Sequence, residues 1–126
     1  NVKLEKAYSD YFAKEGQKFQ KANDIAKAAE NFTKSSQVSN KQLKARGLLS
    51  LGTLYFNNGA SILQKATPYA TSEKEKYEAE KAKALADFKK AQDYLKQAAT
   101  VEPTNEAVKE TQKQVAEAIA PLVEKK

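Results

Sequence analysis

The sequence contains no cysteine, histidine, methionine or tryptophan, and the first two absences remove whole classes of protein. Without Cys or His there is no disulfide framework, no ordinary zinc site, no thiol nucleophile and no Ser-His-Asp triad. Four glycines and three prolines in 126 residues exclude a collagen-like or low-complexity chain. No apolar run approaches the ~18–20 residues of a membrane span. We therefore expect one soluble domain that is not an enzyme and holds no metal or cofactor.

The residues that are abundant, Ala, Lys, Glu, Gln and Leu, are helix formers, and no segment alternates as a strand would. Apolar spacing predicts five helices, the first two over about 2–22 and 25–38, with Asn23-Asp24 as the turn and cap between them. Ser39–Gln42 and Ser72–Glu75 are predicted capping boxes that open the third helix and the long fourth helix. Pro68 and Pro103 are expected to end those two helices, and a last helix begins at Thr104 or Asn105 and kinks or ends near Pro121.

Two series of residues along the chain agree in character and spacing. The first is Phe12, Gly16, Phe19, Ala28, Phe32, Ser35 and Asn40; the second is Leu48, Gly52, Tyr55, Ala91, Leu95, Ala98 and Pro103. Every step matches except one, which is 9 residues in the first series and 36 in the second. In our interpretation the glycines and the alanines at 28 and 91 let two helices approach, and the residues at 12, 19, 48 and 55 fill each hairpin. Phe32 and Leu95 are predicted to pack toward the neighbouring hairpin.

This pattern resembles the tetratricopeptide repeat (TPR), a helix-turn-helix unit of about 34 residues. The resemblance implies an all-α fold of two hairpins, the second with extended helices, followed by a capping helix. It divides a single domain, residues 1–126, into a first repeat over about 9–42, a second over about 45–103 and a capping helix over about 105–123. The first repeat departs from the family at Ser35 and Asn40, where Ala and Pro are usual. The extra 27 residues of the second repeat predict an arm projecting on the order of 15–20 Å.

TPR proteins typically bind a peptide or a partner surface in the groove lined by the first helix of each hairpin. By that resemblance the expected partner-binding residues are Gln17, Lys21, Arg46, Leu49, Thr53, Phe56 and Asn57. Phe56 is the favoured anchor, because aromatic side chains dominate interfaces; packing of Phe56 against the final helix is the alternative. Arg46 is either a partner for a carboxylate or a solvated charge. Chaperone-binding members of the family carry a clamp of Lys and Asn on the first helix. The matching positions here are Ala13 with Gln17 and Leu49 with Thr53, so a chaperone-tail ligand is not favoured.

The net charge of +6 is unevenly distributed. Residues 31–72 contain no acid and carry five cations: Lys34, Lys41, Lys44, Arg46 and Lys65. This stretch is either an incidental aid to solubility or a surface for an acidic partner. Binding of nucleic acid or another anionic surface is the alternative function, although the cations are sparse for phosphate contacts. Salt dependence of binding would distinguish it from an apolar groove.

The family resemblance extends more loosely to TPR proteins of the bacterial cell envelope, on the segment Leu54–Ala60 and the long Lys/Glu-rich second hairpin. It favours the periplasm or cell envelope over the cytoplasm. The chain begins at Asn1 and lacks Met, so we expect a processed or trimmed product. Because about three repeats are usually needed for stability, a homo-oligomer or a larger parent chain would supply the missing neighbour.

Overall fold

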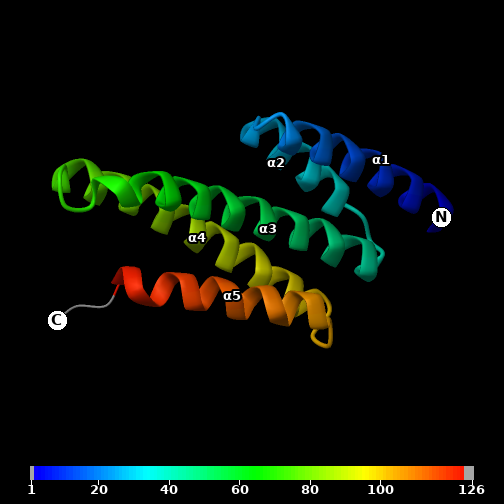
Figure 1. The fold of residues 1–126 in the computed structure, drawn as a ribbon. Helices are drawn as coiled ribbons and strands as arrows, with labels where there is room; N and C mark the ends of the chain where they lie inside the picture. The colour runs from blue at the N-terminus through cyan, green and yellow to red at the C-terminus, as the bar shows by residue number, and fades with distance from the viewer. Residues whose placement is uncertain (1, 124–126) are drawn as a thin grey trace.

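The computed structural model describes residues 2–123 as a row of antiparallel helices, with no strand in that range. The elements are α1 (Val2–Lys21), α2 (Ile25–Ser36), α3 (Lys41–Ala66), the short 3-10 helix η1 (Thr67–Tyr69), α4 (Lys74–Val101) and α5 (Glu106–Val123). Figure 1 shows two hairpins, α1–α2 and α3–α4, with α5 running beside α4. The prediction of an all-α, hairpin-based fold is confirmed.

Several helix ends follow directly from local side chains. Asn23 adopts a left-handed conformation with φ of 63°, the one positive φ at a non-glycine residue in the described range. The Asp24 side chain then accepts a hydrogen bond from the Lys27 amide and caps α2. Asn105 caps α5 in the same way, by accepting from the Val108 amide. α5 continues through Pro121 to Val123.

The two predicted capping boxes are wrong. Asn40, and not Ser39, caps α3, because its side chain accepts from the Leu43 amide, while the Ser39 hydroxyl and amide both donate to the Glu5 carboxylate. α4 begins at Lys74 without any side-chain cap, since the Glu73 amide still bonds back to the Tyr69 carbonyl in the preceding turn. α2 also ends earlier than predicted, at Ser36.

Each hairpin is closed by a glycine on one helix and a bulky side chain on the other. A Cβ at Gly16 would lie 2.5 Å from the Phe32 ring, and one at Gly52 would lie 2.7 Å from Leu95 Cγ. The equivalence of these two contacts matches the two residue series of the sequence. It also adds to their interpretation, because Phe32 and Leu95 cover the glycines inside their own hairpins as well as joining the clusters that reach the next helices.

The predicted extension of the second hairpin is built by repeating that contact. A Cβ at Gly59, seven residues beyond Gly52, would lie 2.9 Å from the ring of Phe88, seven residues before Leu95. In Figure 1 the α1–α2 hairpin lies against only the N-terminal half of α3, and the other half projects beyond it together with α4. We call the part of the second hairpin from residue 57 to residue 85 the arm.

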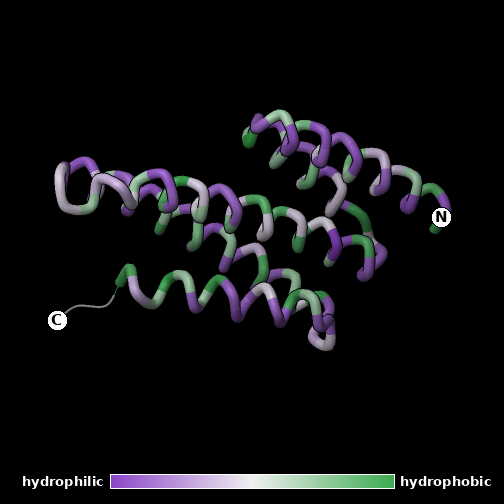
Figure 2. Tube along the Cα trace, viewed as in Figure 1, coloured by the Kyte–Doolittle hydropathy of each residue, from purple (hydrophilic) through white to green (hydrophobic). Residues whose placement is uncertain are grey.

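The core consists of two apolar clusters. One joins the hairpins and contains Ala28, Phe32, Leu48, Leu51, Leu54, Ala98 and Val108; the other joins α3, α4 and α5 and contains Ala84, Phe88, Ala91, Leu95 and Val115. Hydrophobic and hydrophilic residues alternate along every helix in Figure 2, as amphipathic helices require. On α5, Val108 and Val115 are fully buried whereas Lys109 and Lys113 are exposed, so its outer face is polar.

Candidate functional site

The first helices of the array line one face and the second helices the other. The backbones of α1 and α3 and those of α3 and α5 approach each other, whereas no Cα atom of α2 lies within 8 Å of one of α4. Helices that touch on one side and diverge on the other curve the array toward the touching side. The surface of α1, α3 and α5 is therefore the inner face, and that of α2 and α4 the outer face.

Arg46 binds within the molecule. Its guanidinium lies 2.7 Å from the Asp10 carboxylate and donates to the Ser9 hydroxyl at 2.7 Å, which connects α1 to α3. Ser9 is fully buried and shares a second hydrogen bond with Ser35 of α2. The Nε of Arg46 is buried and has no hydrogen-bond partner among residues 2–123. A partner carboxylate would have to compete with Asp10, while 41% of the Arg46 side chain remains exposed to solvent.

Two carboxyl groups at this junction have lowered pKa values. Hydrogen bonds from the Ser39 hydroxyl and amide lower the pKa of Glu5, and hydrogen bonds from Lys6 and Arg46 lower that of Asp10. Both groups stabilise the contact of α1 with the start of α3 only when they are ionised. Sequence reasoning missed this junction, because its residues lie 26 to 37 positions apart and follow no periodic pattern.

Phe56 lies beside an apolar cleft at the base of the arm. Its ring centroid is 5.6 Å from that of Phe88, and it packs against the cluster that includes Leu122 of α5. The cleft has a volume of about 350 Å³, and we call it the arm cleft. It is lined by Phe56, Ala60, Leu63, Gln64, Thr67, Phe88, Ala118, Pro121 and Leu122. Phe56 and the final helix thus line one cleft, and the role of Phe56 as a partner anchor stays a prediction.

The other expected partner-binding residues are divided among separate places. Leu49 is half-buried between the two core clusters, and Thr53 is half-buried on α3. Asn57 lines a polar hollow of about 200 Å³ with Gln20 of α1. Gln17 and Lys21 are exposed on α1. None of these five lines the arm cleft.

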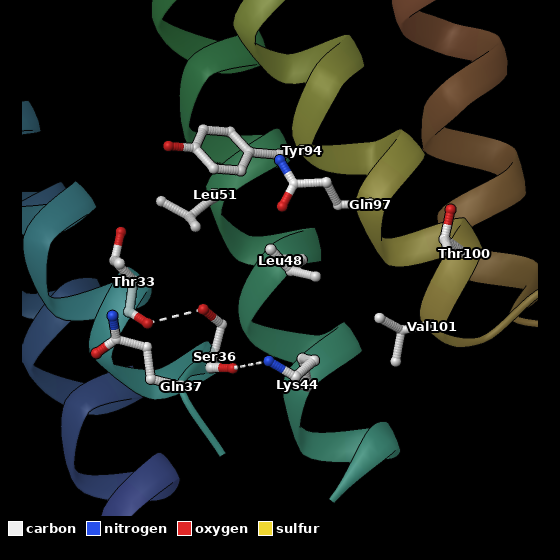
Figure 3. A pocket seen from close by; sticks show the side chains of 10 residues that line it. All are labelled: Thr33, Ser36, Gln37, Lys44, Leu48, Leu51, Tyr94, Gln97, Thr100 and Val101. Carbon is white, nitrogen blue, oxygen red and sulfur yellow. Dashed lines mark hydrogen bonds between the residues drawn. The ribbon is translucent and has the colours of Figure 1, made fainter. Parts of the chain in front are cut away.

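A second cleft lies on the outer face, where α2 and α4 diverge above α3. Its volume is about 460 Å³, and Leu48 and Leu51 of α3 lie between the two walls (Figure 3). We call it the outer cleft. Tyr94 on its α4 side stacks on Tyr55, with centroids 5.9 Å apart and rings 10° from parallel. Burial raises the pKa of both phenols, which are therefore neutral at pH 7.

The acid-free stretch does not form one basic patch. Arg46 is paired with Asp10, and Lys34 lies 3.9 Å from Glu30. Lys41 and Lys65 stand at opposite ends of α3, roughly 36 Å apart at the rise of an α-helix. Phosphates of a nucleic acid would meet only scattered cations on this surface.

Within residues 2–123, no three Asp or Glu side chains are grouped in a way that could hold a metal ion. In the same range no helix is both long enough and apolar enough to cross a bilayer.

The chain is similar in structure to a TPR repeats protein from Bacteroides fragilis, known from its crystal structure. The match has 52% sequence identity and a TM-score of 0.92, and it covers 94% of this chain. The chain spans about half, 53%, of the length of that protein. No protein-family model and no curated protein matches the sequence. The resemblance predicted from the two residue series is confirmed.

Proposed function

Because the chain has the fold of a tetratricopeptide repeat protein, we propose that it is a non-catalytic module that binds an apolar segment of a partner protein in the arm cleft. The TPR fold generally mediates protein–protein interaction, and function has to be argued from the site that a fold carries. The observation that supports this proposal is the composition of the arm cleft: seven of its nine lining residues are apolar, and only Gln64 and Thr67 are polar.

The cleft has the features of a pocket for one or two apolar side chains. Its volume of about 350 Å³ is at the small end of the ~300–1,000 Å³ typical of ligand pockets. Phe56 and Phe88 provide rigid aromatic walls, which are favoured at interfaces because they bury a large area with little loss of side-chain entropy. Pro121 fixes the opposite rim on α5.

An acidic partner is not required at this cleft, because none of its lining residues is charged. The nucleic-acid alternative has less support, since Lys34 and Arg46 of the acid-free stretch have carboxylate partners and Lys65 stands at the far end of α3 from Lys41 and Lys44. Binding in the arm cleft should therefore change little between low and high salt. Phosphate binding would weaken steeply over the same range.

The test is a selection of peptides from a random displayed library on the intact chain, followed by affinity measurements by fluorescence polarisation. Ala60→Glu places a charge at an exposed position in the cleft, and Ala86→Glu makes the same change at an exposed position of α4 outside it. We expect selected peptides to share apolar residues, to bind equally at low and high salt, and to lose at least tenfold in affinity with Ala60→Glu alone. Equal loss with both variants, or no enrichment over an Ala60→Glu target, would refute the proposal.

A further inference from the structure

The outer cleft combines an apolar floor with polar walls. Leu48 is 7% exposed and Leu51 1%, so both present buried aliphatic surface at the bottom. Figure 3 shows α2 residues on one side and α4 residues on the other, with Lys44 at one end. The volume of about 460 Å³ is within the range of small-molecule and peptide sites.

Lys44 is the charged group of this cleft, and no carboxylate neutralises it. Its ammonium donates one hydrogen bond, 3.2 Å long, to the Ser36 carbonyl at the end of α2, which leaves two N–H groups without a partner among the described residues. No Asp or Glu of that range lies within ion-pair distance of it. The C-terminal end of α2 carries only roughly half a negative charge, so its contact with the Lys44 ammonium neutralises that group only in part.

The nearby carboxylates have other partners. Glu5 accepts from Ser39 and Asn40. Asp93, one turn before Gln97, accepts from the Gln97 amide, and Glu102, next to Val101, accepts from Asn105. A second cation, Lys90, lies 5.1 Å above the Tyr55 ring that stacks on Tyr94. Those donors are uncharged, so the three carboxylates keep their negative charges beside the two cations, and Lys44 is the one charged side chain that lines the cleft itself among the described residues.

Two further polar groups of the lining have no partner within the described residues. The Gln37 amide and the Tyr94 hydroxyl make no side-chain hydrogen bond, whereas the hydroxyls of Thr33, Ser36 and Thr100 already donate to carbonyls of their own helices. Gln37 and Tyr94 stand on opposite sides of the leucine floor (Figure 3). They are placed to bond a ligand that lies across it.

We propose that the outer cleft binds a carboxylate attached to an apolar group. The carboxylate pairs with the two remaining N–H groups of Lys44, and the apolar group covers Leu48 and Leu51. Amide groups of the ligand, where it has them, bond to Gln37 and Tyr94. Two sources share this chemistry: the free C-terminus of a peptide with an apolar last residue, and a small branched aliphatic acid. The site is distinct from the arm cleft and does not depend on the function proposed there.

The experiment is a titration of the intact, isotope-labelled chain followed by NMR chemical shifts. The probes are N-acetyl-leucine and N-acetyl-leucinamide, which differ only in the carboxylate. We expect the acid to shift amide signals around Leu48, Leu51 and Tyr94, and to bind at least tenfold more tightly than the amide, as a charge-assisted hydrogen bond implies. Binding of the amide as tight as that of the acid, or no binding of the acid, would overturn the proposal.

Variants separate the site from general effects of charge. Lys44→Gln should lose at least tenfold in affinity for N-acetyl-leucine, and Lys44→Arg should retain most of it. Lys41→Gln is the matched control, since it removes the same charge one turn away on an exposed residue outside the cleft. Equal losses with Lys41→Gln and Lys44→Gln would refute the assignment. Ala60→Glu should leave this titration unchanged, so the two proposals fail independently.

The source of the ligand is decided by two more probes, the peptide Ala-Ala-Leu with a free C-terminus and 4-methylpentanoate. The peptide presents backbone amides to Gln37 and Tyr94, whereas the simple acid presents none. Tighter binding of the peptide, weakened by Tyr94→Phe, identifies a peptide C-terminus. Equal binding of both identifies a small aliphatic acid. If neither binds, the proposed chemistry is wrong.

Discussion

Replacing Gly16 by alanine tests the close packing that defines each hairpin. In an open helix this change is stabilising by about 1 kcal/mol, because alanine is the better helix former. Here the new Cβ would lie 2.5 and 2.6 Å from two carbons of the Phe32 ring. Since packed carbon atoms stand about 3.5–4.0 Å apart, the ring or the helix would have to move by about 1 Å.

Phe32 has little room to move, because it is 1% exposed and belongs to the cluster that joins the two hairpins. Adding a methyl group to a well-packed core costs about 1–3 kcal/mol, and the enclosed ring places this site in the upper part of that range. After subtraction of the helix gain, Gly16→Ala should lower the free energy of unfolding by about 2 kcal/mol. A smaller residue at position 32 should relieve the clash.

The measurement is urea unfolding followed by circular dichroism for Gly16→Ala, Phe32→Leu and the double variant. Gln17→Ala, at the exposed neighbouring position, is the control and should stay within about 0.5 kcal/mol of wild type. We expect the double variant to be more stable than the sum of the single changes by about 1 kcal/mol, as contacting residues are coupled. Additive effects, or a Gly16→Ala variant more stable than wild type, would refute the packing argument.

Three further predictions concern the junction of α1 with the start of α3. Asn40→Ala should lower the free energy of unfolding by about 1 kcal/mol through loss of the α3 cap, measured by urea unfolding, and an effect no larger than that of Lys41→Ala would contradict this. Arg46→Ala should cost up to about 1 kcal/mol, the scale of a partly exposed ion pair, and the double-mutant cycle with Asp10→Ala should show coupling; additivity would exclude the pair. Folding lowers the pKa values of Glu5 and Asp10. The two carboxylates therefore stabilise the folded chain above their unfolded pKa values of 4.5 and 3.8, and this contribution is lost as the pH falls through their pKa values in the folded state. The melting temperature should therefore fall on acidification below these values and fall less steeply in Glu5→Gln, and identical profiles would contradict the assigned hydrogen bonds.

The helices and the repeat could be predicted from the sequence because they depend on local and periodic signals. Apolar spacing located all five α-helices, and the paired positions of Gly16 and Gly52 identified the two hairpins. The contact of Phe32 with Gly16 could not be predicted, because a helix between two neighbours has apolar surface on both sides. Only the rotation of α2 about its axis places the ring above Gly16.

The polar junction and the two clefts lay outside what sequence spacing could predict. Ser39–Gln42 matches the capping-box pattern and Asn40 does not, yet Asn40 caps α3 because Ser39 donates to Glu5, a residue 34 positions away. Arg46 was a candidate for a partner carboxylate until the fold placed Asp10 beside it. The outer cleft exists because α2 and α4 diverge, which is a property of how hairpins stack and not of any one segment.

The contacts of Gly52 with Leu95 and of Gly59 with Phe88 form a repeated unit of the second hairpin that leads into the arm. One step along it is seven residues on each helix, or about 10.5 Å of length, and seven residues return a helix to almost the same face. Adding seven residues to α3 and seven residues to α4 would lengthen the arm and keep each glycine of α3 opposite a bulky side chain of α4. An increment that does not return the helix to nearly the same face would turn one helix against its partner. Arms of related proteins should therefore differ in length by discrete steps, and a designed longer arm should keep the position of the tip relative to both helices.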